Sequence, residues 1–262
     1  MTTKQTNQEK TKYNAPALEK GLDIIEALSE HVEGLTQGEI AKNLDRSQSE
    51  IYRMLSTLVR RGYVVRIPNS DLYSLSLRMF SLSLRHPPIS RLLEYAVPLM
   101  RKFSTQSWQS CHLGVESVGD IVIIRSVEAP GNWGLRIKIG TTVGLANSGT
   151  GRVLSAFRSD RDIDELIKQH RPALGEPELN YPEFMEHIDR IRNLGYEKMP
   201  SSTVIGVTNI SFPIFDANQD AVAAITCPYI ERIDNFKVPS IDEVTEMLKD
   251  LIKEINGFYG DH

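Results

Sequence analysis

The sequence predicts an α+β protein in which a small winged helix-turn-helix domain precedes a larger mixed domain. Three observations support this class. The chain has 262 residues, more than one ordinary domain needs. Two short amphipathic helices and a hairpin pattern follow one another near its start. Strand and helix patterns then alternate over the remainder, which is typical of an α+β domain.

The N-terminal elements follow a polar stretch, residues 1–13, that we expect to be a disordered tail. An amphipathic helix begins near residue 17. Thr36 and Glu39 have the spacing of a capping box, which opens a short helix, and Ser47 repeats this signal for a second, longer helix that ends at Gly62. Strand patterns over residues 63–67 and 72–75 complete a winged helix-turn-helix domain, which we place at residues 14–76.

A short apolar helix follows and meets two prolines, Pro87 and Pro88, which interrupt helices. We place a linker helix at residues 77–90 and the second domain at residues 91–262. In and around that domain we expect helices at residues 89–106, 150–157, 163–169, 182–194 and 240–257. We expect strands at residues 111–115, 121–127, 135–139, 204–215 and 221–229.

Composition excludes several classes of protein. The charge sum, 30 − 34 = −4, excludes a histone-like polycation but not a local basic surface. Cys111 and Cys227 cannot form a disulfide framework or a four-cysteine zinc site, and we expect no metal and no cofactor. The polar N-terminus lacks the apolar core of a secretion signal, and no run approaches the roughly 18 apolar residues of a membrane span, so we expect a cytoplasmic protein without membrane contact.

The second helix of the helix-turn-helix pattern has a polar face suited to DNA. Serine and glutamine hydrogen-bond base edges, and arginine reads guanine in the major groove. Between residues 42 and 66, six basic residues oppose two acidic ones (6 − 2 = +4), which favours phosphate binding. The alternative is that this is only a solvated helix face. For Arg66, near the hairpin turn, the alternative is that it only takes part in the turn. The candidate DNA contacts are Thr36, Arg46, Ser47, Gln48, Ser49, Tyr52, Arg53, Ser56 and, near the turn, Arg66.

A segment of small residues, 144–157, leads from a strand into a helix. Free N–H groups at a helix start favour a carboxylate or phosphate, and Gly149 and Gly151 would let a ligand approach the backbone. The alternative is a turn that only caps the helix. Trp133, on a glycine-flanked loop, is either a pocket lid or a hydrophobic plug, and we take His112 as a core or surface residue. No catalytic triad, paired-carboxylate motif or phosphate loop is visible, so we do not expect an enzyme.

Both halves of the chain resemble one family. The segments ALEKGLDIIEALSE and GLTQGEIAKNLDRSQSEIYRMLSTLVRRGYVVRIPNSDLYSLS closely resemble the winged helix-turn-helix domain of IclR-type bacterial transcriptional regulators. Independently, ANSGTGRVLSAF and LGYEKMPSSTVIGVTNISFPIFDANQDAVAAITCPY are similar to two stretches of that family's second domain. The resemblance covers about residues 15–258.

The resemblance implies a GAF-like second domain that binds a small organic-acid effector, and a homodimer or dimer of dimers on a palindromic operator in double-stranded DNA. Arg152 stands where lysine is usual, and Met199-Pro200-Ser201-Ser202 where many members are acidic, so we do not transfer the effector of any one member. Carried over residue by residue, the resemblance implies an effector site at Leu135, Val143, Gly149, Thr150, Asn209, Thr226 and Cys227.

These expectations describe a DNA-binding transcriptional regulator, a repressor or dual regulator of a catabolic operon, whose operator binding is modulated by a small organic acid. Two alternatives stand beside it. One is a small-acid-metabolising enzyme with a DNA-binding appendage, which the missing catalytic groups disfavour. The other is a constitutive architectural DNA binder that takes no ligand.

Overall fold

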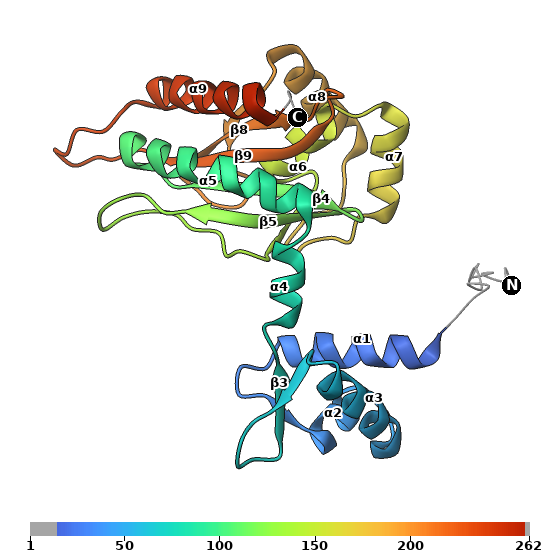
Figure 1. Cartoon of the computed structure of the whole chain (residues 1–262). Coiled ribbons are helices and arrows are strands. Elements are labelled where there is room, and N and C mark those ends of the chain that lie inside the picture. Colours follow the sequence, from blue (N-terminus) through green and yellow to red (C-terminus); the bar gives the residue numbers. More distant parts are fainter. Residues whose placement is uncertain (1–14, 260–262) are drawn as a thin grey trace, which may run out of the picture. The chain divides into compact units, whose positions relative to one another are not determined.

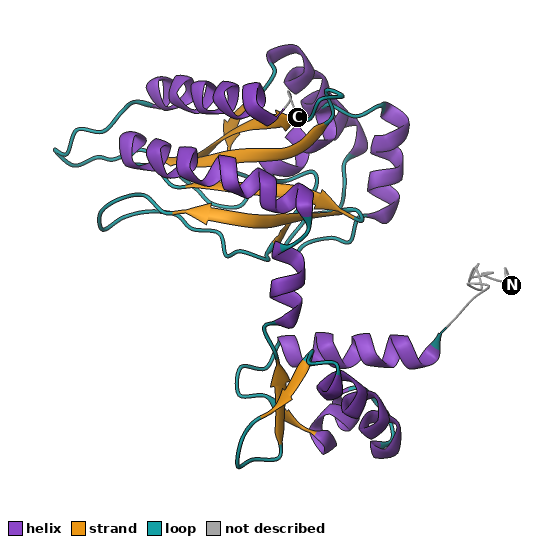
Figure 2. Ribbon diagram, viewed as in Figure 1, coloured by secondary structure: helices purple, strands orange, loops and turns teal. Residues whose placement is uncertain are grey.

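The computed structural model describes residues 15–259, so the predicted tail at residues 1–13 lies outside the described residues. The chain divides into two compact units that meet between Ser90 and Arg91. Figures 1 and 2 show that the first unit combines helices with a small sheet, and that the second is built around a larger sheet with helices packed on it. The predicted α+β class is confirmed.

The first unit contains the expected helices and hairpin. Its helices are α1 (Pro16–Ser29), α2 (Gln37–Asn43) and α3 (Gln48–Arg60). Its antiparallel sheet has the order β1-β3-β2, with β1 (Leu35–Thr36), β2 (Val64–Arg66) and β3 (Leu72–Leu75). The two-residue strand β1 was not predicted, because nothing in so short a segment announces its pairing with β3.

Both predicted capping boxes are present. The hydroxyl of Thr36 accepts from the N–H of Glu39, whose carboxylate in turn accepts from the N–H of Thr36, and Ser47 and Glu50 repeat this exchange at the start of α3. Each exchange satisfies N–H groups that a helix start leaves without a partner. An apolar core between the helices and the hairpin fixes their positions, with Ile24, Ile40, Ile51, Leu55 and Val64 all buried.

Two further helices lie around the boundary between the units. The first, α4 (Arg78–Leu84), has none of its residues buried. The second, α5 (Pro87–Ser107), begins at the proline pair that was expected only to break a helix. Proline is tolerated in the first turn of a helix, where its missing N–H has no intrahelical role, so Pro87 and Pro88 open α5 instead of delaying it.

The second unit is built on an antiparallel sheet with the order β6-β5-β4-β9-β8-β7. Its strands are β4 (Cys111–Ser117), β5 (Asp120–Val127), β6 (Thr142–Val143), β7 (Glu197–Pro200), β8 (Val207–Phe215) and β9 (Ala221–Ile230). The expected strand over residues 135–139 is wrong, because these residues form a loop and the short β6 pairs with β5 instead. The edge strand β7 was not predicted.

Helices cover both faces of this sheet. Figure 1 shows α5 and α9 (Ile241–Tyr259) side by side along one face, where the rings of Tyr95 and Phe258 lie 3.7 Å apart. On the other face lie α6 (Gly149–Ala156), α7 (Asp160–Gln169) and α8 (Tyr181–Leu194). Ile121, Leu154 and Phe184 belong to the buried core on this second face. No helix among residues 15–259 is both long and apolar enough to cross a membrane.

Candidate DNA-binding surface and effector cavity

The polar face of α3 is exposed along its length. Ser49, Arg53 and Ser56 follow each other at spacings of four and three, so they share one side of the helix. The neighbouring predicted contacts Gln48 and Tyr52 are exposed too. Within residues 15–259, the guanidinium of Arg53 has no ion pair or hydrogen bond. This face therefore offers the side chains that a recognition helix presents to base edges.

Two of the predicted DNA contacts are used to start helices. The hydroxyl protons of Thr36 and Ser47 go to the carboxylates of Glu39 and Glu50, at 2.8 Å in each case. Neither hydroxyl is then available to donate to a phosphate or a base. Their place in the structure is at the N-termini of α2 and α3, where they set the starting points of both helices.

The basic residues around α3 differ in how they are held. Arg46 is exposed in the turn before α3. Arg66, on the wing strand β2, forms an ion pair with Asp71 and donates from Nε to the carbonyl of Ser70 at 3.2 Å. Lys20 of α1 lies 2.5 Å from Glu50 of α3, and this contact together with the Ser47 cap lowers the pKa of Glu50 to about 2. The ion pair ties α3 to α1.

The second unit contains a cavity of about 330 Å³ beside the start of α6. Six of the seven predicted effector residues line it: Leu135, Val143, Gly149, Thr150, Asn209 and Thr226. Cys227 does not, because successive residues of a strand point to opposite faces of a sheet. Thr226 and Pro228 of β9 line the cavity, whereas Cys227 is buried on the other face, and burial raises the pKa of its thiol. The prediction that Cys227 lines the cavity is wrong, because it is displaced by one residue along the strand.

One end of the cavity carries the donors that the sequence predicts. The Ser148 hydroxyl caps α6 by accepting from the N–H of Gly151 at 2.9 Å. The N–H groups of Gly149 and Thr150 have no hydrogen-bond partner within residues 15–259. Thr150 and Thr226 add two hydroxyls, whose oxygens lie 2.9 Å apart. A helix start with unpartnered N–H groups carries a partial positive charge and suits an anion.

The glycines at this helix start are required by packing. A Cβ atom at Gly149 would overlap the hydroxyl of Ser211 and lie 3.0 Å from Oε2 of Glu197. One at Gly151 would overlap the carbonyl oxygens of Gly144 and Leu145. Both glycines thus bring α6 close to β8 and to the preceding loop. Packing alone explains why glycine stands at both positions, so the expectation that these glycines admit a ligand to the backbone stays a prediction.

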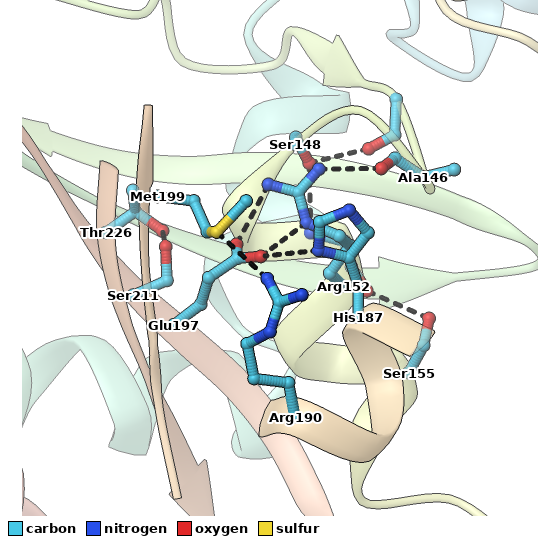
Figure 3. Close-up of polar contacts among 12 residues, drawn as sticks. Ala146, Ser148, Arg152, Ser155, His187, Arg190, Glu197, Met199, Ser211 and Thr226 are labelled. Atoms are coloured by element: carbon cyan, nitrogen blue, oxygen red, sulfur yellow. Dashed lines mark hydrogen bonds and ion pairs between the residues drawn. The ribbon is translucent and has the colours of Figure 1, made fainter. Parts of the chain in front are cut away.

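Behind the helix start lies a buried ion pair, shown in Figure 3. The guanidinium of Arg152 binds both carboxylate oxygens of Glu197 on β7, at 2.6 and 3.0 Å, and donates to the carbonyl of Ala146 at 2.7 Å. Neither charged side chain is more than 3% exposed. His187 lies beside them with Nδ1 4.0 Å from Glu197, and burial, followed by the charge of Arg152, lowers its pKa. From the sequence, Arg152 was notable only because it stands where lysine is usual, and its pairing with Glu197 was not predicted.

Glu176 holds the same loop from the cavity side. Its carboxylate accepts from the N–H groups of Leu145 and Ala146, at 2.7 and 3.4 Å, and lies 2.8 Å from Nε2 of His170. The peptide around Ala146 is therefore fixed by Glu176 through its N–H groups and by Arg152 through its carbonyl. Glu176 carries no signal in the sequence, because it lies in a loop about 30 residues from the backbone that it binds.

His112 also belongs to the cavity, although the sequence analysis set it aside as a core or surface residue. Its ring is only 4% exposed, and Nε2 lies 3.3 Å from the hydroxyl of Thr150. Burial lowers its pKa to about 4, so the ring is neutral at pH 7. Trp133 is 78% exposed, so it is not a hydrophobic plug, and its role as a lid stays a prediction. Within the described range, no group of three or more potential ligands is placed to hold a metal ion.

Comparison with known proteins matches both units to models of the same family. The family model described as the IclR helix-turn-helix domain matches residues 17–68, and that of the bacterial transcriptional regulator IclR C-terminal domain matches residues 89–256. The transcriptional regulator KdgR of Escherichia coli K12 is 26% identical over 246 residues, covering 93% of this chain and 92% of its own. The E. coli K12 transcriptional repressor AllR is 23% identical and covers 81% of this chain and 79% of its own.

Solved structures show the fold. Pseudomonas aeruginosa HmgR has a TM-score of 0.72 at 22% identity, covering 94% of this chain and 100% of its own. An IclR homologue from Microbacterium hydrocarbonoxydans, solved in complex with 4-hydroxybenzoate, has a TM-score of 0.73 at 19% identity, covering 92% of this chain and 98% of its own. The relatives that match along most of the chain are HTH-type transcriptional regulators. The chain belongs to the IclR family of bacterial transcriptional regulators.

Proposed function

We propose that the protein is a repressor or dual regulator of a catabolic operon whose operator binding changes when a small organic acid occupies the cavity beside α6. One observation carries the proposal: the N–H groups of Gly149 and Thr150 have no partner in the described part of the chain, and they lie at one end of a cavity of about 330 Å³. The relative solved with 4-hydroxybenzoate lends support to an acid of this kind.

The lining of the cavity fits a carboxylate with a carbon body. A carboxylate accepts hydrogen bonds and donates none, and the lining offers N–H and hydroxyl donors at the start of α6 and, from β8, the amide of Asn209. The lining also includes apolar side chains, which exclude water from the body of a ligand. These apolar side chains are Leu135, Ile137, Val143, Val204 and Val207.

The protein partner that we infer for the first unit is a second copy of the chain. A palindromic operator presents two half-sites about 34 Å apart, and two recognition helices are needed to occupy both. The unit exposes apolar side chains on two helices: Leu18 and Leu22 on α1, and Met79, Phe80, Leu82 and Leu84 on α4. Covering them in a homodimer would remove a surface that a monomer rarely exposes.

Regulation then follows from a shift between two arrangements of the dimer. An acid that binds one arrangement more tightly raises its population, and the spacing of the two recognition helices changes with it. Because both half-sites must be bound together, a change of spacing releases or engages the operator as a whole.

The DNA-binding half of the proposal is tested with Arg53→Ala. An arginine that reads a base contributes about 1–3 kcal/mol, so the variant is expected to bind the DNA upstream of its own gene about 10- to 100-fold more weakly in a gel-shift titration. Arg161→Ala, an exposed arginine on α7, is the matched control and is expected to bind like the wild type. Equal affinity of all three proteins would reject α3 as the recognition helix.

The effector half is tested by calorimetry with acetate, benzoate and 4-hydroxybenzoate. Thr226→Val keeps the shape of the side chain and removes its hydroxyl, so the affinity of any acid that binds is expected to fall about tenfold. Thr105→Val, an exposed threonine on α5, should bind like the wild type. A constitutive DNA binder would bind none of the acids, and unchanged affinity in Thr226→Val would place the carboxylate elsewhere.

A further inference from the structure

Four buried polar side chains form a continuous relay from the cavity into the sheet. The Nε2 atom of His112 lies 3.3 Å from the hydroxyl of Thr150, which lies 2.9 Å from that of Thr226, which lies 2.8 Å from that of Ser211. They come from β4, α6, β9 and β8 in turn, and none is more than 4% exposed. His112, Thr150 and Thr226 line the cavity, whereas Ser211 does not.

Counting protons shows what the relay can offer to a ligand. If Nε2 of His112 carries no proton, Thr150 must donate to it, Thr226 to Thr150 and Ser211 to Thr226, so all three hydroxyl protons are used. If Nε2 carries a proton, the ring donates to Thr150 and only two hydroxyl protons are needed for the other two bonds. One hydroxyl proton then remains for a ligand atom that accepts.

The charged groups around His112 already have partners, so His112 is the group whose protonation a bound anion would change. Its neighbours on the adjacent strands, Ser126 and Thr226, are uncharged. Of the charged residues that line the cavity, Arg136 is paired with Glu128, and Glu176 is held by His170 and backbone N–H groups. Behind α6, Arg152 and Glu197 neutralise each other, and His187 lies beside them.

We propose that the effector carboxylate is bound together with a proton on His112, so that this histidine is a binding determinant of the cavity and makes acid sensing depend on pH. This rests on the proposed function, because it assumes that a carboxylate occupies the end of the cavity near Gly149. Protonation gives both ring nitrogens a hydrogen, which secures the donor orientation of the relay and places a positive charge close to the anion.

The expected size of the effect follows from the geometry. An anion that accepts from the Thr150 hydroxyl lies about two hydrogen-bond lengths, about 6 Å, from Nε2 of His112, and at that distance its charge raises the pKa of the ring by about two units. Starting from a pKa of about 4 without ligand, His112 then takes up about half a proton when the acid binds at pH 6. After correction for the acid's own ionisation, the affinity of the carboxylate for the protein is expected to rise about tenfold from pH 7 to pH 5.

The experiment is calorimetry of the full-length protein at pH 6 in two buffers with different ionisation enthalpies. The probes are acetate, benzoate and 4-hydroxybenzoate, with acetamide, benzamide and 4-hydroxybenzamide as uncharged matches. In the wild type, a carboxylate that binds should show a heat that depends on the buffer, equivalent to about half a proton. His112→Gln keeps a hydrogen-bond donor and cannot take up the proton, so its heat should not depend on the buffer.

Two further measurements separate the outcomes. His187→Gln should keep the uptake, because that ring lies behind α6. If His112→Gln does not fold, the ¹⁵N resonances of the wild-type ring should change to those of a doubly protonated imidazole when the acid is added. A carboxylate that binds the wild type without buffer dependence overturns this inference and leaves the proposed function standing. If none of the carboxylates binds, the proposed function fails as well.

Discussion

Arg152 illustrates how one buried side chain can hold the loop beside a cavity in a single geometry. A buried ion pair is by itself weak evidence of stability, because the cost of taking two charges out of water offsets their attraction. Here the guanidinium also holds the carbonyl of Ala146, whose N–H is held by Glu176. The loop that precedes the helix start is thus fixed before a ligand arrives, which reduces the ordering that binding requires.

The buried ring of His112 makes the stability of the second unit depend on pH. The unfolded chain binds a proton at this residue below about pH 6.5, the folded chain only near pH 4, so stability falls as the pH drops between those values. We expect a loss of about 2 kcal/mol between pH 7 and pH 4.5 that His112→Gln does not show.

Urea unfolding followed by tryptophan fluorescence measures this loss, since Trp108 and Trp133 both lie in the second unit. The exposed His86 supplies the control, because His86→Gln should show the same pH dependence as the wild type. Parallel pH profiles for the wild type and His112→Gln would contradict the assignment.

At the scale of residues, the segments that resemble the family predict side chains that the structure brings together at one cavity. Gly149, Thr150, Asn209 and Thr226 all line the cavity. Cys227 fails because a shift of one residue along a strand moves a side chain to the other face, and the motif could not be aligned to that accuracy. His112, His170 and Glu176 gave no signal because each contacts a group far along the chain: the hydroxyl of Thr150, the carbonyl of Gly119 and the N–H of Leu145, in that order. A single polar residue carries no local sign of such a contact.

Among the elements, α3 depends on its first turn. Ser47 and Glu50 form the capping box, and Glu50 also holds Lys20 of α1. The cap therefore stabilises the helix and fixes its place against α1 at the same residue. This is why a serine in the predicted DNA-contact set is better explained by the start of the helix than by base contact.

Replacing Ser47 by alanine removes the cap, and we expect the first unit to lose about 1 kcal/mol of unfolding free energy. Thermal unfolding followed by circular dichroism measures this loss. Ser56→Ala is the matched control, because Ser56 is exposed and lies two turns along α3 from the cap, so its removal should leave stability within about 0.5 kcal/mol of the wild type. A Ser47→Ala protein as stable as Ser56→Ala would show that the cap contributes nothing.

The elements that the sequence predicted correctly are those with a local signal. The capping boxes and apolar periodicity placed α1, α2 and α3, and turn residues around Gly119 placed the hairpin of β4 and β5. The short strands β1, β6 and β7 were missed because their pairing partners, and not their own residues, determine them. The segment 135–139 alternates apolar and polar residues as a strand would, yet Leu135 and Ile137 face the cavity from a loop.

For the whole molecule, the proposed homodimer would cover the exposed apolar side chains of α1 and α4. We expect Phe80→Ser to shift the protein toward the monomer at micromolar concentration, as measured by sedimentation equilibrium, because Phe80 is 60% exposed at present and a serine offers little apolar area. Leu194→Ser, at an exposed leucine of α8, should leave the dimer intact. Identical association of the two variants would rule out this face as the dimer contact.

The ion pair between Arg66 and Asp71 predicts when the wing acts in the proposed DNA binding. Away from DNA the two charges cancel at long range, so the wing contributes little to the electrostatic attraction that guides the first encounter. We expect that, once α3 has entered the groove, a phosphate next to the wing replaces Asp71 as the partner of Arg66. The wing arginine is then expected to influence how long the complex lasts more than how fast it forms.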